Sequence, residues 1–407
     1  MKNLQMNRRH VLAGLGTTAA LATVGLPVKH ARAAGSPAMI GALNPVSGAG
    51  SAYGSGMQKA IIMAAEEINA AGGAAGQMIE VIGEDTQTSP EAAVNAAKKL
   101  VEVNNVGAIL GTWSSGVTLA VMPITTAAGV PLMCTSGAPA ISTEDKADLV
   151  WRFQATNDRF GRAFAKIADR EGYKTAATMA FNNASGIGNT EGFKKSWGGE
   201  IVGDVVYEPK RPSYRSELQQ VMASNPDVIV MGSYLPDTTI ILREWFQLGG
   251  KNKWIIPGWA ANDKLVEALG AEVCEGVISV ESVSNESAES YAHFDKGYQA
   301  ATGSPASSNV YAAMTYDMMI VWGLAMAAAG EGADSAAVNA KLRDVGNPDG
   351  AEVYTFADGV EALKSGPINY QGASSRLDFD EYGDVTPDFG MSVIKDGKIE
   401  RVAVVSI

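Results

Sequence analysis

The sequence has very few cysteine and histidine residues. Only two cysteines, Cys134 and Cys274, occur among 407 residues, and they stand 140 residues apart. Two of the three histidines fall in the first 33 residues, which leaves His293. Two distant cysteines exclude a disulfide-rich scaffold, because such scaffolds need several closely spaced cysteines. One further histidine cannot complete a zinc or transition-metal site of the usual type, so we expect no metal and no cofactor.

Motifs of the common enzyme and nucleotide-binding classes are also missing. The sequence has no G-x-S-x-G and no Walker A motif, and its nearest approach to G-x-G-x-x-G, at 48–53, lacks the third glycine. A Ser-His-Asp triad would have to use His293, which lies in a polar helical segment and is expected to face solvent. We therefore expect a protein that is not an enzyme.

Basic residues are scarce relative to acidic ones. The chain has 32 lysines and arginines against 44 aspartates and glutamates, a net charge of −12. Without residues 1–33, which hold five basic and no acidic residues, the net charge becomes −17. This balance argues against nucleic acid and anionic membrane surfaces as partners, because both repel an acidic protein.

The first 33 residues have the pattern of an export signal. Arg8 and Arg9 precede an apolar run, and the small-x-small sequence at 31–33 is a cleavage site. The paired arginines and the positive charge near the cleavage site favour twin-arginine export over the general secretory route. Three glycines and a proline in the run argue against a membrane anchor. We expect cleavage near Ala33/Ala34 and a periplasmic protein.

Strand-like and helix-like segments alternate along the rest of the chain, which predicts parallel sheets with helices on both faces. The clearest helix begins with Ser89 as its N-cap and Pro90 at its first position. The length that remains after the signal suits two domains. Strands are expected at 39–43, 78–83, 106–111, 130–135, 175–181, 201–207, 227–232, 254–257 and 276–280.

Two segments near the C-terminus are distinctive. Residues 306–330 form the longest apolar stretch, and its length would allow a membrane-spanning helix. Asp317 near its centre favours a buried core helix instead. Residues 391–405 predict a β-hairpin that turns at Asp396-Gly397.

The segment 39–73 is the most informative part of the chain. A short apolar strand leads into a Gly/Ser-rich loop that contains Tyr53, and a helix follows whose apolar residues share one face. Gly72 and Gly73 end this helix, as glycine does where the chain turns with positive φ. A strand that feeds a loop and a helix N-terminus forms a cleft suited to a small anionic or polar ligand.

The segment 109–142 repeats this arrangement twice. One strand ends before Trp113, Ser114 and Ser115, and the next ends before the loop Ser136-Gly137-Ala138. Two neighbouring strand ends thus offer hydroxyl and backbone N–H groups to one space, which can hold a carboxylate without a lysine or arginine. The alternative for the first two serines is simple helix capping, and the alternative for Tyr53 and Trp113 is core packing.

These segments resemble, in their order and spacing, the type I periplasmic substrate-binding proteins of the leucine/isoleucine/valine-binding family. The shared motifs are the opening strand, loop and helix ending in INAAGG, the GTWSSG and CTSGAP loops, and YAAMTYD. The resemblance covers residues from about 37 to the C-terminus. It implies an α/β fold of two doubly wound parallel-sheet lobes joined by three hinge crossovers.

The family pattern also places the lobes and the cysteines. Lobe 1 would comprise 37–156 plus 284–387, and lobe 2 would comprise 157–283 plus 388–407. Cys134 and Cys274 would then lie in different lobes, where a bond between them would pin a moving cleft. We therefore expect two free, buried thiols.

The resemblance implies which residues contact the ligand. Ser115 matches a serine hydroxyl donor, and Ser136 and Ala138 match loop positions whose backbone completes a carboxylate clamp. Tyr53 and Tyr234 match aromatic positions of the cleft. The complete expected set is Tyr53, Trp113, Ser114, Ser115, Ser136, Gly137, Ala138, Ser185, Tyr234 and Trp259.

One part of the family pattern is absent. The amino-acid binders carry a glutamate for the ligand's ammonium where this chain has Gly258 or Trp259, and Ser185 replaces a tyrosine. A buried ammonium without a carboxylate would be costly. Two alternatives stay open. Either the ligand is an aromatic or aliphatic carboxylate or amide without the ammonium, or Asp237 or another acid reaches the ammonium from a shifted loop.

The resemblance implies a periplasmic component of an ABC-type importer. It would bind a branched-chain amino acid or related small carboxylate between its lobes and deliver it to a membrane permease, and the family expectation is a monomer. A ligand-sensing receptor for a separate signalling partner and an exported enzyme are the alternatives from other classes.

Overall fold

The computed structural model describes residues 36–407, so the expected export signal and its cleavage site lie outside the described residues. A first sheet contains five parallel strands in the order β2-β1-β3-β4-β5. The sequence predicted four of them to within three residues at each end and missed β5. The strands are β1 (Ala38–Asn44), β2 (Ile79–Asp85), β3 (Ile109–Thr112), β4 (Leu132–Cys134) and β5 (Val150–Arg152).

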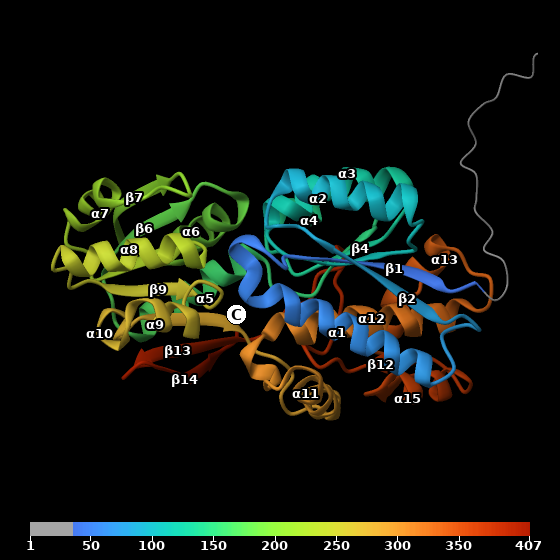
Figure 1. Ribbon diagram of the computed structural model, residues 1–407. Helices are drawn as coiled ribbons and strands as arrows, with labels where there is room; N and C mark the ends of the chain where they lie inside the picture. Colours follow the sequence, from blue (N-terminus) through green and yellow to red (C-terminus); the bar gives the residue numbers. More distant parts are fainter. Residues whose placement is uncertain (1–35) are drawn as a thin grey trace, which may run out of the picture. The chain divides into compact units, whose positions relative to one another are not determined.

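Helices cover both faces of this sheet, as the alternating pattern predicts. The helices α1 (Ser51–Ala70) and α12 (Val310–Ala329) pack against each other on one face, and α2 (Pro90–Lys98) and α3 (Ser115–Ala128) lie on the other (Figure 1). The apolar stripe of α1 is buried. Ser89 caps α2, because its hydroxyl accepts a hydrogen bond from the backbone N–H of Ala92.

A second sheet contains seven strands in the order β14-β13-β10-β9-β8-β6-β7. The strands β6 to β10 run parallel, whereas β13 is antiparallel to β10 and β14 is antiparallel to β13. The two lobes are thus α/β and mainly parallel, and the second adds an antiparallel hairpin. The strands are β6 (Thr175–Phe181), β7 (Glu200–Tyr207), β8 (Val228–Gly232), β9 (Lys253–Pro257), β10 (Ile278–Ser282), β13 (Phe389–Lys395) and β14 (Lys398–Val405).

The helices of the second lobe alternate with its strands, and the C-terminal hairpin turns where the sequence predicts. Asp396 and Gly397 have φ values of 49° and 76°, the left-handed conformation that a two-residue hairpin turn of type I′ requires. The helices are α5 (Asn157–Arg170), α6 (Ala184–Ser196), α7 (Arg215–Met222), α8 (Leu235–Gln247), α9 (Asp263–Leu269) and α10 (Ala271–Cys274).

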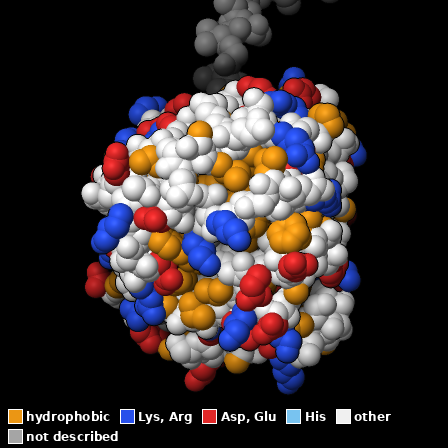
Figure 2. All heavy atoms as spheres, turned by 90° about the vertical axis from the view of Figure 1, so that its left-hand side faces the viewer, with side chains coloured by type: hydrophobic (Ala, Val, Ile, Leu, Met, Phe, Trp, Pro, Cys, Tyr) orange, Lys and Arg blue, Asp and Glu red, His pale blue; other side chains and the backbone are white. Residues whose placement is uncertain are grey.

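The edge strands of the second sheet leave some apolar side chains in solvent. Val206 on β7 and Val402 and Val404 on β14 are each about half exposed. Figure 2 shows hydrophobic side chains on this side of the molecule, interspersed with charged ones. Scattered exposed apolar residues are normal for a folded protein, and charges among them discourage edge-to-edge pairing.

The chain crosses between the sheets three times. It leaves the first sheet after β5, returns after β10 to form α11 (Glu289–Thr302), and passes from the small β11 (Ala351–Val353)–β12 (Ile368–Tyr370) pair into β13. The three crossovers agree with the expected fold. The exact limits of the two lobes stay a prediction.

The long apolar stretch forms the core helix α12. It is long and apolar enough to cross a membrane, but 83% of its apolar window is buried inside the protein. The fully buried Asp317 carboxylate accepts hydrogen bonds from the Tyr370 hydroxyl, the backbone N–H of Ala373, and both the backbone N–H and hydroxyl of Ser374, at 2.6–2.9 Å. The central acid therefore anchors the third crossover to the core.

The scarce residues lie where the sequence predicts. Cys134 and Cys274 are free and buried, and burial raises the pKa of each thiol to about 11. His293 on α11 is half exposed, and its Nε2 lies 3.0 Å from a carboxylate oxygen of Glu67. Both thiols are therefore held as neutral core side chains at physiological pH.

Candidate functional site

A small cavity, with about 20 Å³ accessible to a water-sized sphere, lies at the carboxyl ends of strands from both sheets. Its lining follows β3, β4 and β5 in the first sheet and β6, β8 and β9 in the second, with one residue from α12. Ligands of open α/β sheets bind at such strand ends. The lining residues are Trp113, Ser114, Ser115, Thr135, Ser136, Gly137, Gln154, Ala155, Asn157, Phe160, Ser185, Tyr234, Trp259 and Tyr311.

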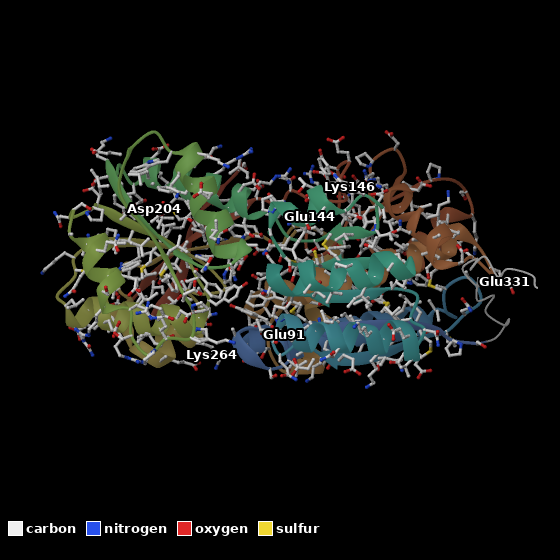
Figure 3. The ribbon with its side chains drawn as sticks, turned by 90° about the horizontal axis from the view of Figure 1, so that it is seen from above. Glu91, Glu144, Lys146, Asp204, Lys264 and Glu331 are labelled. Carbon is white, nitrogen blue, oxygen red and sulfur yellow. The ribbon has the colours of Figure 1, made fainter. Side chains whose placement is uncertain are left out.

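No charged side chain lines this cavity. Other charged residues of both lobes lie in solvent, among them Glu144 and Lys146 of the first lobe and Asp204 and Lys264 of the second (Figure 3). Any ligand charge must therefore be met by hydroxyl groups, amide groups and helix ends.

The turn between β3 and α3 carries Ser114 and Ser115. The Ser115 hydroxyl faces the loop after β4, and the Ser114 hydroxyl faces the second lobe. Ser114 precedes the helix with φ 78° and ψ 121°, a strained conformation for a residue with a side chain. Neither serine caps the helix, so the capping interpretation is wrong. The Ser115 hydroxyl accepts from the backbone N–H of Ala138 at 3.0 Å, and the Ser114 hydroxyl accepts from the Tyr234 hydroxyl at 3.1 Å.

Several backbone N–H groups at these two strand ends have no hydrogen-bond acceptor among the described residues. In the described part of the chain, the backbone N–H groups of Ser115 and Gly116 at the start of α3, and of Ser136 and Gly137 after β4, make no hydrogen bond. The Ser115 hydroxyl uses its oxygen as an acceptor, so its hydrogen stays free. The helix α3 continues past Pro123 to Ala128, so its dipole lies behind these groups.

Arg152 holds the loop after β4 from behind. Its guanidinium, which is completely buried, donates to the carbonyls of Ser136 at 2.8 Å and Ala138 at 3.1 Å. It also donates to the Ser142 hydroxyl at 2.6 Å and forms an ion pair with Asp384 at 2.8 Å. Because the carbonyls are bound to Arg152, the loop is fixed with its N–H groups available to the cavity.

Aromatic side chains form the other walls. The Trp113 ring lies 5.0 Å from the Tyr234 ring and 6.1 Å from the Tyr311 ring, and Trp259 packs on Phe160 at 4.9 Å. The Trp259 indole N–H is used internally, since it donates to the carbonyl of Ser233. These walls suit an apolar or aromatic ligand body.

Two buried polar atoms of the cavity lining have no partner among the described residues, the Thr135 hydroxyl and the side-chain carbonyl oxygen of Asn157. The Asn157 amide nitrogen is bound, donating to Asn189 Oδ1 at 2.7 Å and to the Ser185 hydroxyl at 3.3 Å. Unpartnered buried polar atoms are rare and costly. Their presence in a cavity favours a polar ligand.

A carboxyl group lies directly behind the lining. Burial raises the pKa of Glu281 to about 7, although Ser282 N–H, Gln154 and Tyr311 donate to it. Glu281 has no basic partner in the described chain. A side chain on Gly258 would collide with Glu281, so glycine is required there to admit this acid.

Asp237 does not line the cavity. Its carboxylate accepts from the Tyr214 hydroxyl at 2.5 Å and from the backbone N–H of Lys210. It is therefore engaged within the second lobe, and the structure does not bring it to the ligand space as one alternative supposed.

Eight of the ten expected contact residues line the cavity. Ala138 and Tyr53 are not among the lining residues. The backbone N–H of Ala138 donates to the Ser115 hydroxyl, and the Tyr53 hydroxyl accepts from the Asn262 side chain at 2.6 Å. Sequence reasoning missed six lining residues, which are Gln154, Asn157, Tyr311, Thr135, Ala155 and Phe160. The signal for the first two is their place directly after β5, a strand that was itself missed. The eight expected residues that line the cavity are Trp113, Ser114, Ser115, Ser136, Gly137, Ser185, Tyr234 and Trp259.

Two mainly parallel lobes, three crossovers and a cavity at the strand ends define a two-lobed solute-binding protein. The periplasmic binding protein family model matches residues 37–365, and the chain belongs to this family. Members of the family are solute-binding proteins exported to the periplasm. The expectation drawn from the GTWSSG and CTSGAP loops is thereby confirmed at the level of the family.

Curated relatives agree with this assignment. The chain is 26% identical to the Leu/Ile/Val-binding protein BraC3 of Rhizobium johnstonii over 82% of this chain and 90% of that protein. It is 29% identical to BasB, a substrate-binding protein of a chemotactic signal transduction system in Halobacterium salinarum, over 48% of this chain. That match spans only 50% of BasB.

Solved structures share the fold. The leucine-binding protein LivK of Thermotoga maritima superposes with a TM-score of 0.77 at 24% identity, covering 90% of this chain and 98% of that one. A solute-binding protein of an ABC transporter from R. palustris, in complex with benzoate, superposes with a TM-score of 0.70 at 22% identity over 91% and 96% of the two chains. At these identities the likeness concerns the fold.

Proposed function

We propose that this protein is the solute-binding component of an ABC-type importer, acting as a monomer after cleavage near Ala33/Ala34. It takes a small carboxylate with an apolar body between its lobes and presents it to a membrane permease, without catalysing a reaction. The observation that carries the proposal is the group of unused donors at the ends of β3 and β4, beside aromatic walls.

The donor set supports a carboxylate. Backbone N–H groups and a hydroxyl at a helix start stabilise an anion without a basic side chain. The eight cavity-lining residues of the expected set are the proposed ligand contacts, with Ala138 and Tyr53 as their supports. BraC3 and LivK, by their names, bind branched-chain amino acids, which makes a branched-chain amino acid or related small carboxylate the first ligand to test. Because a protein of this fold has been solved in complex with benzoate, a carboxylate without an ammonium is the second ligand to test.

Thermal unfolding of purified 34–407, freed of co-purified ligand, tests the proposal. The panel contains branched-chain and aromatic amino acids, the deaminated acids of the same skeletons, benzoate and small amides. A ligand at 100 times its Kd adds about 2.7 kcal/mol to the free energy of unfolding, which shifts the midpoint visibly. Stabilisation by one or more carboxylates is the expected result, and stabilisation by amides alone would contradict a carboxylate site.

Signalling is a second candidate, favoured by the match to BasB. In that case a membrane receptor, instead of a permease, recognises the ligand-bound form. Genes for a permease and an ATPase beside this gene would support import, whereas a neighbouring receptor or sensor kinase gene would support signalling.

A further inference from the structure

Two tyrosine hydroxyls join the two lobes directly. Tyr53, in the first turn of α1, accepts a hydrogen bond at 2.6 Å from the side-chain amide of Asn262, which stands just before α9 in the second lobe. Tyr234, just before α8 in the second lobe, donates to the Ser114 hydroxyl of the first lobe at 3.1 Å. The partners are 209 and 120 positions apart in the sequence. Protein groups alone therefore bridge the space between the lobes.

The side chain of Asn262 is held in one orientation by the helix that it begins. Its Oδ1 caps α9 by accepting from the backbone N–H groups of Lys264 and Leu265 at 3.0 and 3.3 Å. Its Nδ2 donates to the Tyr53 hydroxyl and, at 3.3 Å, to the carbonyl of Trp259. Because the cap fixes the amide beforehand, little rotamer freedom is lost when the two lobes meet.

Tyr53 is fixed in the same way on the side of the first lobe. Its backbone carbonyl accepts from the Asn309 side chain at 3.0 Å, and its ring is 8% exposed. The ring packs edge-on against Tyr311 at 5.0 Å and lies 6.2 Å from Trp113. These two neighbours line the cavity, whereas Tyr53 and Asn262 do not. The bond between the lobes thus lies beside the solute space and outside it.

We propose that the Tyr53–Asn262 bond is a latch that holds the cleft closed independently of the solute, with Asn262 as its positioning residue. The inference goes beyond the proposed function, because it concerns the protein before any solute arrives. Parting the lobes exchanges this bond for bonds to water. We expect loss of the bond to lower the ratio of closed to open molecules about tenfold, which corresponds to about 1.4 kcal/mol.

Such a latch would control the exchange of solute. In the closed form only about 20 Å³ of the cavity is accessible to a water-sized sphere, so a solute enters and leaves through open molecules. The apparent rate of association scales with the fraction of open molecules. A latch that acts without solute therefore slows both uptake and release.

Pulsed electron paramagnetic resonance on the mature protein, freed of co-purified ligand, tests the inference. Nitroxide labels are attached at Lys98→Cys on α2 and Lys195→Cys on α6, two exposed positions carried by different lobes (Figure 1). The native thiols of Cys134 and Cys274 are buried and stay unlabelled. Rotation of the lobes changes the distance between the labels, so the distance distribution gives the proportions of closed and open molecules.

Three single variants and one double variant are compared in the labelled protein. Tyr53→Phe removes the hydroxyl and keeps the ring, and Asn262→Ser keeps a residue that caps a helix but is too short to reach Tyr53. Their combination completes a double-mutant cycle. Tyr354→Phe is the matched control, because this tyrosine hydroxyl bonds to Glu352, two residues away. Thermal unfolding shows which variants fold, and Tyr53→Phe decides the test if Asn262→Ser does not fold.

The expected result is a mainly closed wild type and a mainly closed Tyr354→Phe. Tyr53→Phe and Asn262→Ser each lower the ratio of closed to open molecules about tenfold, and the double variant lowers it no further. An open wild type, unchanged ratios in Tyr53→Phe, or effects that add in the double variant would overturn the latch. Because no solute is added, each of these results leaves the proposed function to be judged by the panel of acids and amides.

Discussion

At the scale of single residues, the site is built from hydrogen-bonding groups that do not satisfy the helix start beside them. Ser114 and Ser115 stand where helix-capping serines stand, yet neither hydroxyl caps α3. The strained backbone of Ser114 turns the two hydroxyls toward Tyr234 and the loop after β4. Strain of this kind persists where a function requires the geometry. The helix start is consequently free to act on an anion.

Replacement of Ser115 by alanine tests this arrangement. The variant loses the hydroxyl donor and leaves the Ala138 N–H unpaired, so we expect carboxylate ligands to bind about 1–3 kcal/mol more weakly. Calorimetric titration with the tightest acid of the panel measures the change. Ser307→Ala, at an exposed serine that is not part of the cavity lining, is the control and should bind as the wild type. An unchanged Kd for Ser115→Ala would remove this residue from the site.

The sequence revealed those site residues that follow predicted strands directly. Trp113, Ser114 and Ser115 follow β3, and Ser136 follows β4, so recognising the strand was enough to find them. Asn157 and Tyr311 depend on other information. The first follows an unrecognised strand, and the second reaches the cavity from a helix about two hundred residues after β3, through packing that no local pattern encodes.

At the scale of elements, β5 shows why one strand escaped prediction. It has three residues, and its last is Arg152, which is completely buried. A buried arginine is rare and breaks the apolar pattern on which strand prediction depends. Its charge is tolerated because Asp384, two carbonyls and a hydroxyl meet it. The ion-pair partner Asp384 lies 232 residues away in the sequence, so the pair becomes visible only in the fold.

Arg152→Met should destabilise the protein and weaken ligand binding together. The variant leaves the Asp384 carboxylate nearly buried without its partner, which costs about 3–5 kcal/mol in comparable pairs. It also releases the carbonyls of Ser136 and Ala138, so the loop N–H groups lose their fixed direction. Urea unfolding measures the first effect and calorimetry with a carboxylate the second.

A matched control for this variant is Arg401→Met. Arg401 pairs with Glu286 on the surface, with both side chains about two-fifths exposed, and such pairs contribute about 0–1 kcal/mol. A comparable loss of stability in the two variants would contradict a special role for the buried pair. A destabilised Arg152→Met that still binds carboxylates as the wild type does would limit Arg152 to stability.

At the scale of the whole molecule, the crossovers are joined to one another by polar contacts. Gln154 of the first crossover donates to Glu281 at the end of β10, and its own amide oxygen accepts from the Ser282 hydroxyl. Tyr311 on α12 donates to the other oxygen of Glu281 at 3.3 Å. The two-lobed fold was predictable because alternating strands and helices are local, whereas this network joins segments that are remote in sequence.

Glu281 should make stability depend on pH. Its pKa is raised from 4.5 to about 7 by burial, so the folded state holds the proton more tightly than the unfolded state does. Its contribution is fully present below about pH 4.5 and is lost as the pH rises through about 7. Glu281→Gln mimics the protonated side chain and can keep the contacts with Gln154 and Tyr311, so it should not lose stability over this range.

Urea unfolding of both proteins between pH 5 and pH 8 measures the effect. Because Glu281 is only partly buried by surface area, the stability of Glu281→Gln relative to the wild type should rise by about 1–3 kcal/mol over this range, less than the full shift would give. The difference between the two profiles cancels other groups, such as Asp317, whose pKa is raised to about 6 by burial. Parallel pH profiles of stability for the two proteins would contradict the prediction. They would show that Glu281 ionises in the folded state with no loss of stability, which requires water to reach its carboxylate among Gln154, Ser282 and Tyr311.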